Sequence, residues 1–371
     1  MVIGSQLTRW WVRRRLDIAR YWHSRGELGE ALPHARAAMR LASRVGSVDL
    51  YCLTALAVAE IGKDGAAHAA SRSLLEEAVR LLDEAPSTRD RDRLLARTLT
   101  CLGDGYRRVG HYREATIVLS RALHLVERND PPDPTLLVAV LTATGIAAKE
   151  RGAYDEAARC YADIAEVYVR EGASAAAEAT LRHNLAGLAY AREEYSQAES
   201  HARRAVALRR RARAAPIELA ADVAVLAATL AAQGRDDEAR HHLERALAVS
   251  RAARPPRCHE VAVQLHLLAT IEQTNGHLDD AERRYRQALS IKEQLLGWDH
   301  PEIAVVCNNL GTLAHERRLR REAAEWYGRA LRIAARPDLA AHPLGTAIRE
   351  NLRRLELHHD EPTTAIMAKW S

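Results

Sequence analysis

The sequence repeats itself at an interval of about 42 residues, and this interval limits the folds that the chain can adopt. Leu268 and Tyr285 recur 42 positions later as Leu310 and Tyr327, and the same register extends backwards to define eight units. A unit of this length cannot bury its apolar face alone. We therefore expect the units to stack on their neighbours and to share one continuous core.

Each unit carries small residues at fixed positions. The first of these columns is Ala or Gly in all eight units: Ala19, Ala59, Gly103, Gly145, Ala186, Ala227, Ala269 and Gly311. Two helices that cross closely need a small residue at the crossing and a bulky one beside it. We therefore expect each unit to be a helix pair whose two helices meet at the first column. The turn between them often contains a Gly that can end the first helix in a left-handed cap, as at Gly26, Gly110, Gly152, Gly234 and Gly276.

Composition supports a helical protein. The chain contains 70 Ala, few Gly and Pro for its length, and no Phe. Ala favours helices, and its small side chain lets helices approach closely. Arg outnumbers Lys by 50 to 4, which indicates a GC-rich coding sequence, and we expect a bacterial source. The predicted fold class is all-α.

The spacing resembles that of the tetratricopeptide repeat family. The period of 42 is similar to that of kinesin-light-chain repeats, and so are two motifs: Asn308-Asn309-Leu310-Gly311 within a first helix, and Leu296-Gly297-Trp298-Asp299-His300-Pro301-Glu302 between units. The resemblance implies a right-handed superhelical solenoid of about eight helix pairs with a C-terminal capping helix. We expect one solenoid over residues 1–357 and a flexible tail over 358–371. The expected units cover residues 13–45, 53–84, 94–128, 136–170, 179–212, 217–251, 259–295 and 301–336, followed by a capping helix over 342–357.

The resemblance also implies that the first helices line a concave groove, with positions three and four apart directed into it. The predicted peptide-groove residues are Arg97, Asp104, Arg107, Thr142, Lys149, His183, Asn184, Tyr190, His266, Thr270, Gln273, Asn308, Asn309, Thr312 and His315. In relatives of this family, an Asn at the position of Asn184 and Asn309 commonly binds ligand backbone. An amide side chain can bond both the N–H and the C=O of an extended peptide. The alternative is that these are the ordinary polar residues of a solvated face.

The motifs of several enzyme classes are missing. Gly62-Lys63-Asp64 lacks the upstream Gly and the hydroxyl of a phosphate-binding loop, and no H-E-x-x-H sequence occurs. The five cysteines are scattered without a C-x-x-C pair, so we expect free thiols in a reducing cytoplasm. We expect no enzyme activity, no cofactor and no metal.

The predicted function is a non-enzymatic scaffold or adaptor that binds another protein or peptide. The alternatives are a peptide-sensing regulatory protein and an accessory subunit of a biosynthetic or modifying enzyme. A formal charge of +5 allows an acidic partner. The arginines of residues 203–213 lack aromatic neighbours for base stacking, so we do not expect nucleic acid.

The longest apolar run, Val223 to Ala232, is too short for a membrane span.

The two ends of the chain leave alternatives open. Trp10 and Trp11 either pack onto the first unit or form an exposed anchor for a partner or a membrane surface. Self-association through these tryptophans or through the C-terminal tail is a further alternative.

Overall fold

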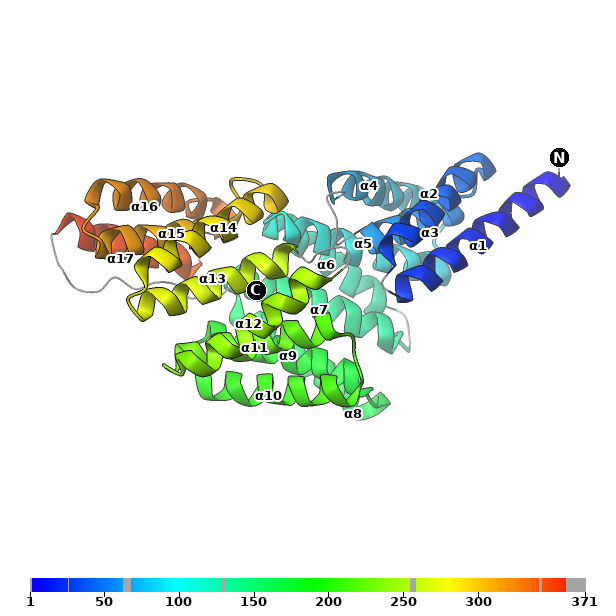
Figure 1. Cartoon of the computed structure of the whole chain (residues 1–371). Helices are drawn as coiled ribbons and strands as arrows, with labels where there is room; N and C mark the ends of the chain where they lie inside the picture. The colour runs from blue at the N-terminus through cyan, green and yellow to red at the C-terminus, as the bar shows by residue number, and fades with distance from the viewer. Residues whose placement is uncertain are drawn as a thin grey trace. The chain divides into compact units, whose positions relative to one another are not determined.

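The computed structural model describes residues 2–25, 27–62, 68–128, 131–253, 258–339 and 342–357. These residues form seventeen α-helices and one short 3₁₀ helix (Pro337–Leu339), and they contain no strand. Sixteen of the helices follow one another as eight pairs (Figure 1): α1 (Val2–Ser24) and α2 (Leu28–Val45), α3 (Val48–Gly62) and α4 (His68–Glu84), α5 (Arg89–Arg108) and α6 (Tyr112–Glu127), α7 (Pro134–Glu150) and α8 (Tyr154–Glu171), α9 (Ala175–Ala191) and α10 (Tyr195–Arg211), α11 (Pro216–Ala232) and α12 (Asp236–Ala252), α13 (Cys258–Thr274) and α14 (Leu278–Leu296), and α15 (Pro301–Glu316) and α16 (Arg320–Ala334). A last helix, α17 (Pro343–Glu356), packs on α16. The predicted all-α solenoid of helix pairs is confirmed.

The chain divides into two compact units, which we call unit 1 (Met1–Ala147) and unit 2 (Ala148–Ser371). Within each unit, helices that are neighbours in sequence pack on each other, as α1 does on α2 and α15 on α16. The single solenoid over residues 1–357 and the hand of its superhelix stay predictions.

The first column of small residues lies where the two helices of a pair meet, as expected. All eight of its members are buried. A Cβ atom at Gly103 would lie 2.5 Å from Leu119 Cγ, and a Cβ atom at Gly311 would lie 2.6 Å from the Tyr327 ring. Because real Cβ atoms do not approach other atoms so closely, only glycine fits at these two crossings.

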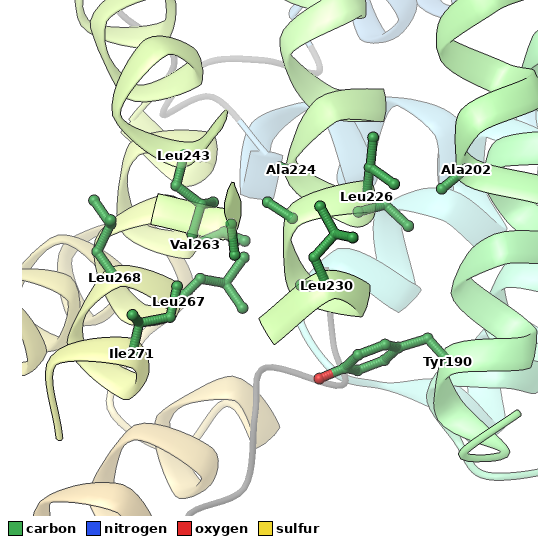
Figure 2. Packing of buried hydrophobic residues seen from close by; sticks show 14 of the residues in the cluster. Tyr190, Ala202, Ala224, Leu226, Leu230, Leu243, Val263, Leu267, Leu268 and Ile271 are labelled. Atoms are coloured by element: carbon green, nitrogen blue, oxygen red, sulfur yellow. The ribbon is translucent and has the colours of Figure 1, made fainter. Parts of the chain in front are cut away.

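The largest buried cluster of unit 2 is built from α9 to α14. Figure 2 shows Leu226 and Leu230 of α11 between Tyr190 of α9 on one side and Leu267 and Leu268 of α13 on the other. Apolar side chains from successive pairs thus interlock, and each pair completes the core of the next one.

The turns inside the pairs have the predicted left-handed geometry. Gly110, Gly152, Gly234 and Gly276 have φ values between 73° and 84°. Glu193 and Arg318 occupy the same turn position in the pairs without Gly, with φ of 65° and 63°. Gly26 lies outside the described residues.

The first turn of unit 2 lies against the start of its last helix. A Cβ atom at Gly152 would lie 3.2 Å from the ring of His342 and 3.4 Å from Pro343 Cδ. Segments about 190 residues apart in sequence are therefore in contact within this unit.

None of the helices in the described ranges is both long and apolar enough to cross a membrane.

Candidate functional site

Unit 1 contains a groove of about 620 Å³ between side chains of α3, α4, α5 and α7, which we call the unit 1 groove. Its floor is apolar. It includes Leu75 and Leu136, both buried, and the α7 residues Ala139, Ala143 and Ile146. Ala139 is exposed, whereas Ala143 and Ile146 are half-buried. The groove is thus open to solvent along α7 and is closed beneath by the core of unit 1.

Charged side chains form the rim of the unit 1 groove, and each one has an opposite partner. Arg97 Nη2 lies 3.1 Å from Glu60 Oε1, and Arg93 is paired with Asp133. Arg72 Nε lies 3.7 Å from Glu76. Because these guanidiniums already have carboxylate partners, the rim is polar and nearly balanced in charge.

Asp104 is the most strongly held acid of this rim. Arg107 Nη2 lies 2.6 Å and Arg108 Nε 2.8 Å from its two carboxylate oxygens. Burial by itself would raise the pKa of Asp104, but the two guanidiniums outweigh burial and hold the pKa below its usual range. Asp104 is therefore charged at neutral pH.

Three of the predicted groove residues, Arg97, Asp104 and Thr142, line the unit 1 groove. Arg107 lies beside it, through its ion pair with Asp104. Sequence reasoning did not name several other lining residues: Glu60, Arg72, Arg93, Asp133, Ala139 and Ala143. A signal for two of the pairs was present, because Arg93 and Asp133 are 40 positions apart and Glu60 and Arg97 are 37 apart, close to one repeat.

Lys149, near the end of α7, and the predicted residues of α9 lie in unit 2, apart from the unit 1 groove. His183 Nδ1 lies 2.9 Å from Asp222 Oδ1, and Arg209 Nε donates to Asp222 Oδ2 at 2.9 Å. Asp222 is only 1% exposed, so the two partners satisfy a buried carboxylate. Asn184 is half-buried. Lys149 and Tyr190 are buried, and burial raises the pKa of the Tyr190 hydroxyl.

The predicted residues of α13 and α15, except His315, are buried and take part in hydrogen bonds within the fold. Their contacts pair Asn309 Nδ2 with His266 Nε2 at 3.0 Å, and Gln273 Nε2 with Thr312 Oγ1 at 3.2 Å. Asn351 of α17 donates to Asn308 Oδ1 at 3.0 Å. The remaining members are Thr270, which is also buried, and His315, which is half-buried.

Tyr285 of α14 joins this group from the second helix of the pair. Its hydroxyl lies 3.0 Å from both Thr270 Oγ1 and Gln273 Oε1, while Gln273 Nε2 donates to Glu316 at 2.7 Å. Buried polar side chains that bond one another make a pair of helices specific for its neighbour. That the α13 and α15 residues contact a peptide stays a prediction.

The described residues include no group of three His, Cys, Asp or Glu side chains that could hold a metal ion. The five cysteines, all within the described ranges, form no disulfide. Burial raises the pKa of Cys52 and of Cys307 to about 12, so these two thiols are protonated at neutral pH.

Family models match the second half of the chain. One model described as tetratricopeptide repeat matches residues 218–294 and 260–336, and a second with the same description matches residues 179–213. No curated protein matches the sequence.

Solved structures with the same fold cover most of the chain. A Rap protein complexed with competence and sporulation factor is 11% identical, with a TM-score of 0.64 over 94% of this chain and 98% of that chain. The Rap conjugation gene regulator of plasmid pLS20, in complex with the Phr* peptide, is 15% identical, with a TM-score of 0.55 over 94% and 96% of the two chains. A signal transduction ATPase with a tetratricopeptide repeat sensor from Pyrococcus horikoshii is 12% identical, with a TM-score of 0.52 over 88% of this chain and 46% of that chain. The family models thus identify tetratricopeptide repeats at residues 179–213 and 218–336, and the solved structures show the same fold over most of the chain.

Proposed function

We propose that this protein is a non-enzymatic scaffold that holds an extended segment of another protein in the unit 1 groove. The observation that carries the proposal is an open groove of about 620 Å³ whose floor is apolar and whose rim is balanced in charge. Binding grooves for peptides combine apolar pockets for side chains with a few polar groups that fix the backbone.

The groove favours a segment with aliphatic side chains. Ala139, Ala143 and Ile146 leave room for such side chains along α7. The hydroxyls of Thr100 and Thr142 also line the groove and can bond the backbone of a bound segment. Because the rim arginines have carboxylate partners, the unit 1 groove does not select strongly for the charge of its ligand.

Two of the structures with the same fold are complexes, one with competence and sporulation factor and one with the Phr* peptide. They support peptide binding as a use of this fold, and they favour a second candidate function, a regulator that senses a short free peptide. The two candidates differ in the ligand: a regulator binds a short free peptide tightly, whereas a scaffold binds a segment within a folded partner.

An acidic partner is supported by a different surface. Arg210, Arg211 and Arg213 are exposed at the end of α10 and have no ion pair within the described ranges. Burial lowers the pKa of the neighbouring His242, and the positive charges of His241, Arg245 and Arg210 lower it further, although Glu238 opposes them. Positive charges that crowd one another in this way are relieved by an acidic segment. Cysteines without disulfides fit the cytoplasmic location that we propose.

The test uses peptides selected from a random phage-displayed library on the full chain. We expect the selected peptides to carry aliphatic side chains. Ala139→Trp fills the unit 1 groove from an exposed position, so we expect about a tenfold or greater loss of affinity by fluorescence anisotropy.

Ala324→Trp is the matched control, because Ala324 is exposed on α16 of unit 2, outside the groove. We expect it to leave the affinity unchanged. Peptides that bind both variants as well as they bind the wild type would show that the unit 1 groove is not the binding site.

A further inference from the structure

Helix α1 has an apolar side chain on both of its faces. Val12, Leu16 and Ala19 are buried against α2 and α3. At 100° per residue, Leu7, Trp10 and Tyr21 lie on the opposite side of the helix. The solvent face of a helix ordinarily carries charged and polar residues, whereas the outer face of α1 also carries these large apolar side chains.

The apolar side chains on this face are large and exposed. Leu7 is 58% exposed, Trp10 56% and Trp11 49%. The two indole rings contact each other edge to face, with centroids 4.9 Å apart. Exposed aromatic residues that gather on one face mark an interaction surface, whereas single exposed apolar residues do not.

Arginines flank these rings. Arg9, Arg13 and Arg14 are exposed, and no ion pair is found for them among the described residues. The acid on this stretch of α1 is Asp17, which lies 3.9 Å from Arg20. The first half of α1 thus presents tryptophan and uncompensated positive charge together.

We propose that the outer face of α1, formed by Leu7, Trp10, Trp11 and Arg14 with the exposed Arg9 and Arg13 at its side, binds the surface of an anionic lipid bilayer. Helix α1 lies along the surface, with Leu7 and the two indoles at the boundary between headgroups and acyl chains. Tryptophan favours this boundary because its ring is largely apolar and its N–H can bond water or headgroup oxygens. The arginines bind lipid phosphates, and their long side chains allow the guanidiniums to stay at headgroup level.

The positive charge of this face favours an anionic bilayer over a second copy of the chain. A two-fold interface brings the same face of two molecules together. It would place Arg9, Arg13 and Arg14 of one copy against the same arginines of the other. An anionic bilayer supplies the opposite charge and a layer that accepts apolar rings.

The experiment is sedimentation of the full chain with vesicles of phosphatidylcholine, alone or with about one quarter phosphatidylglycerol. We expect the wild type to sediment with the anionic vesicles and to be released from them by salt. Its affinity for the neutral vesicles should be lower by a factor of about ten or more. The double variant Trp10→Ala/Trp11→Ala should lose about tenfold in affinity for anionic vesicles. The triple variant Arg9→Gln/Arg13→Gln/Arg14→Gln should lose at least as much, and its remaining binding should no longer depend on salt.

Trp298→Ala is the matched control, because Trp298 is 74% exposed in unit 2. We expect it to bind vesicles as the wild type does, and circular dichroism should show the same helix content in every variant. Failure of the wild type to bind anionic vesicles would overturn the proposal, as would an equal loss in Trp298→Ala. A wild type that is a dimer by light scattering and becomes a monomer in Trp10→Ala/Trp11→Ala, with vesicle binding unchanged, would instead make this face an interface between copies.

Discussion

At the scale of single residues, the helix crossings are the most demanding positions in the chain. Gly103 faces Leu119, whose side chain is fully buried. Gly105 lies two positions further along the same helix, and a Cβ atom there would meet nothing within 4 Å. The fold therefore requires glycine at position 103 but has room for a larger residue at position 105.

Gly103→Ala should destabilise the protein by about 1–3 kcal/mol, because the added methyl group has to displace Leu119. Gly105→Ala is the control on the same helix and should stabilise by about 0.5–1 kcal/mol, because Ala loses less backbone entropy in a helix. Urea unfolding followed by circular dichroism measures both. Equal effects of the two changes would contradict the crossing geometry.

The turns between paired helices offer a second comparison. Arg318 is exposed and has a left-handed φ of 63°. The equivalent turn one repeat earlier has Gly276, with φ of 79°. This conformation is sterically unfavourable for an L-residue with a Cβ atom, so Arg318→Gly should stabilise the folded protein by about 1 kcal/mol. Gly276→Ala should destabilise by a similar amount. The midpoints of thermal unfolding test both, and a lower midpoint for Arg318→Gly would count against a strained turn.

At the scale of elements, the junction between α14 and α15 contains buried charge. Glu302 is paired with Lys292 and lies 3.0 Å from His259 Nε2. His300 caps α15, because its Nδ1 accepts from the Glu302 N–H at 3.2 Å. Burial, followed by the nearby positive charges of Lys292 and His259, lowers the pKa of His300 to about 4, against the pull of Glu302.

This junction should make unfolding sensitive to acid. As pH falls from about 6.5 towards 4, the unfolded chain protonates His300 and the folded chain does not, so the stability that neutral His300 gives is lost. Between pH 7 and pH 5 the loss is about 2 kcal/mol. Burial raises the pKa of Glu302, but Lys292 and His259 together hold this pKa well below its usual value. Protonation of Glu302 therefore adds a further loss of stability only below about pH 4.5.

His300→Asn is the matched variant, since an Asn side chain can also accept the capping N–H but does not titrate. It should be less stable at pH 7, because the buried ring is lost, yet show a smaller change between pH 7 and pH 5. Urea midpoints at the two pH values give the comparison. An unchanged pH dependence in His300→Asn would assign the acid sensitivity to other groups.

At the scale of the whole molecule, the contacts that join consecutive helix pairs recur at nearly one repeat. Asp49 with Arg91 and His266 with Asn309 are two examples, 42 and 43 positions apart. Each pair therefore depends chiefly on its sequence neighbours, and stability is approximately a sum of local and neighbouring terms.

A destabilising substitution should accordingly affect its own helix pair and the neighbouring pairs only. In the Gly103→Ala variant, amide hydrogen exchange should become faster in α5, α6 and the helices beside them, while α15 and α16 keep their wild-type rates. Mass spectrometry of peptic fragments resolves these segments. Faster exchange across both units would show that the molecule opens as one cooperative body.

The sequence by itself determined the repeat, the helix pairs, the buried columns of small residues and the left-handed turns. These features depend on sterics within one pair or between neighbouring pairs, and such contacts recur at a fixed spacing that the sequence displays. The period also located the crossings where only glycine fits.

Only the tertiary structure decided which predicted groove residues are open. Thr142, His266 and Asn308 each lie three positions before a first-column residue. Thr142 lines the unit 1 groove, whereas His266 and Asn308 are fully buried. The register sets the direction of a side chain from its own helix. Its exposure depends on which other helices cover it, as α17 does for Asn308 through the bond from Asn351.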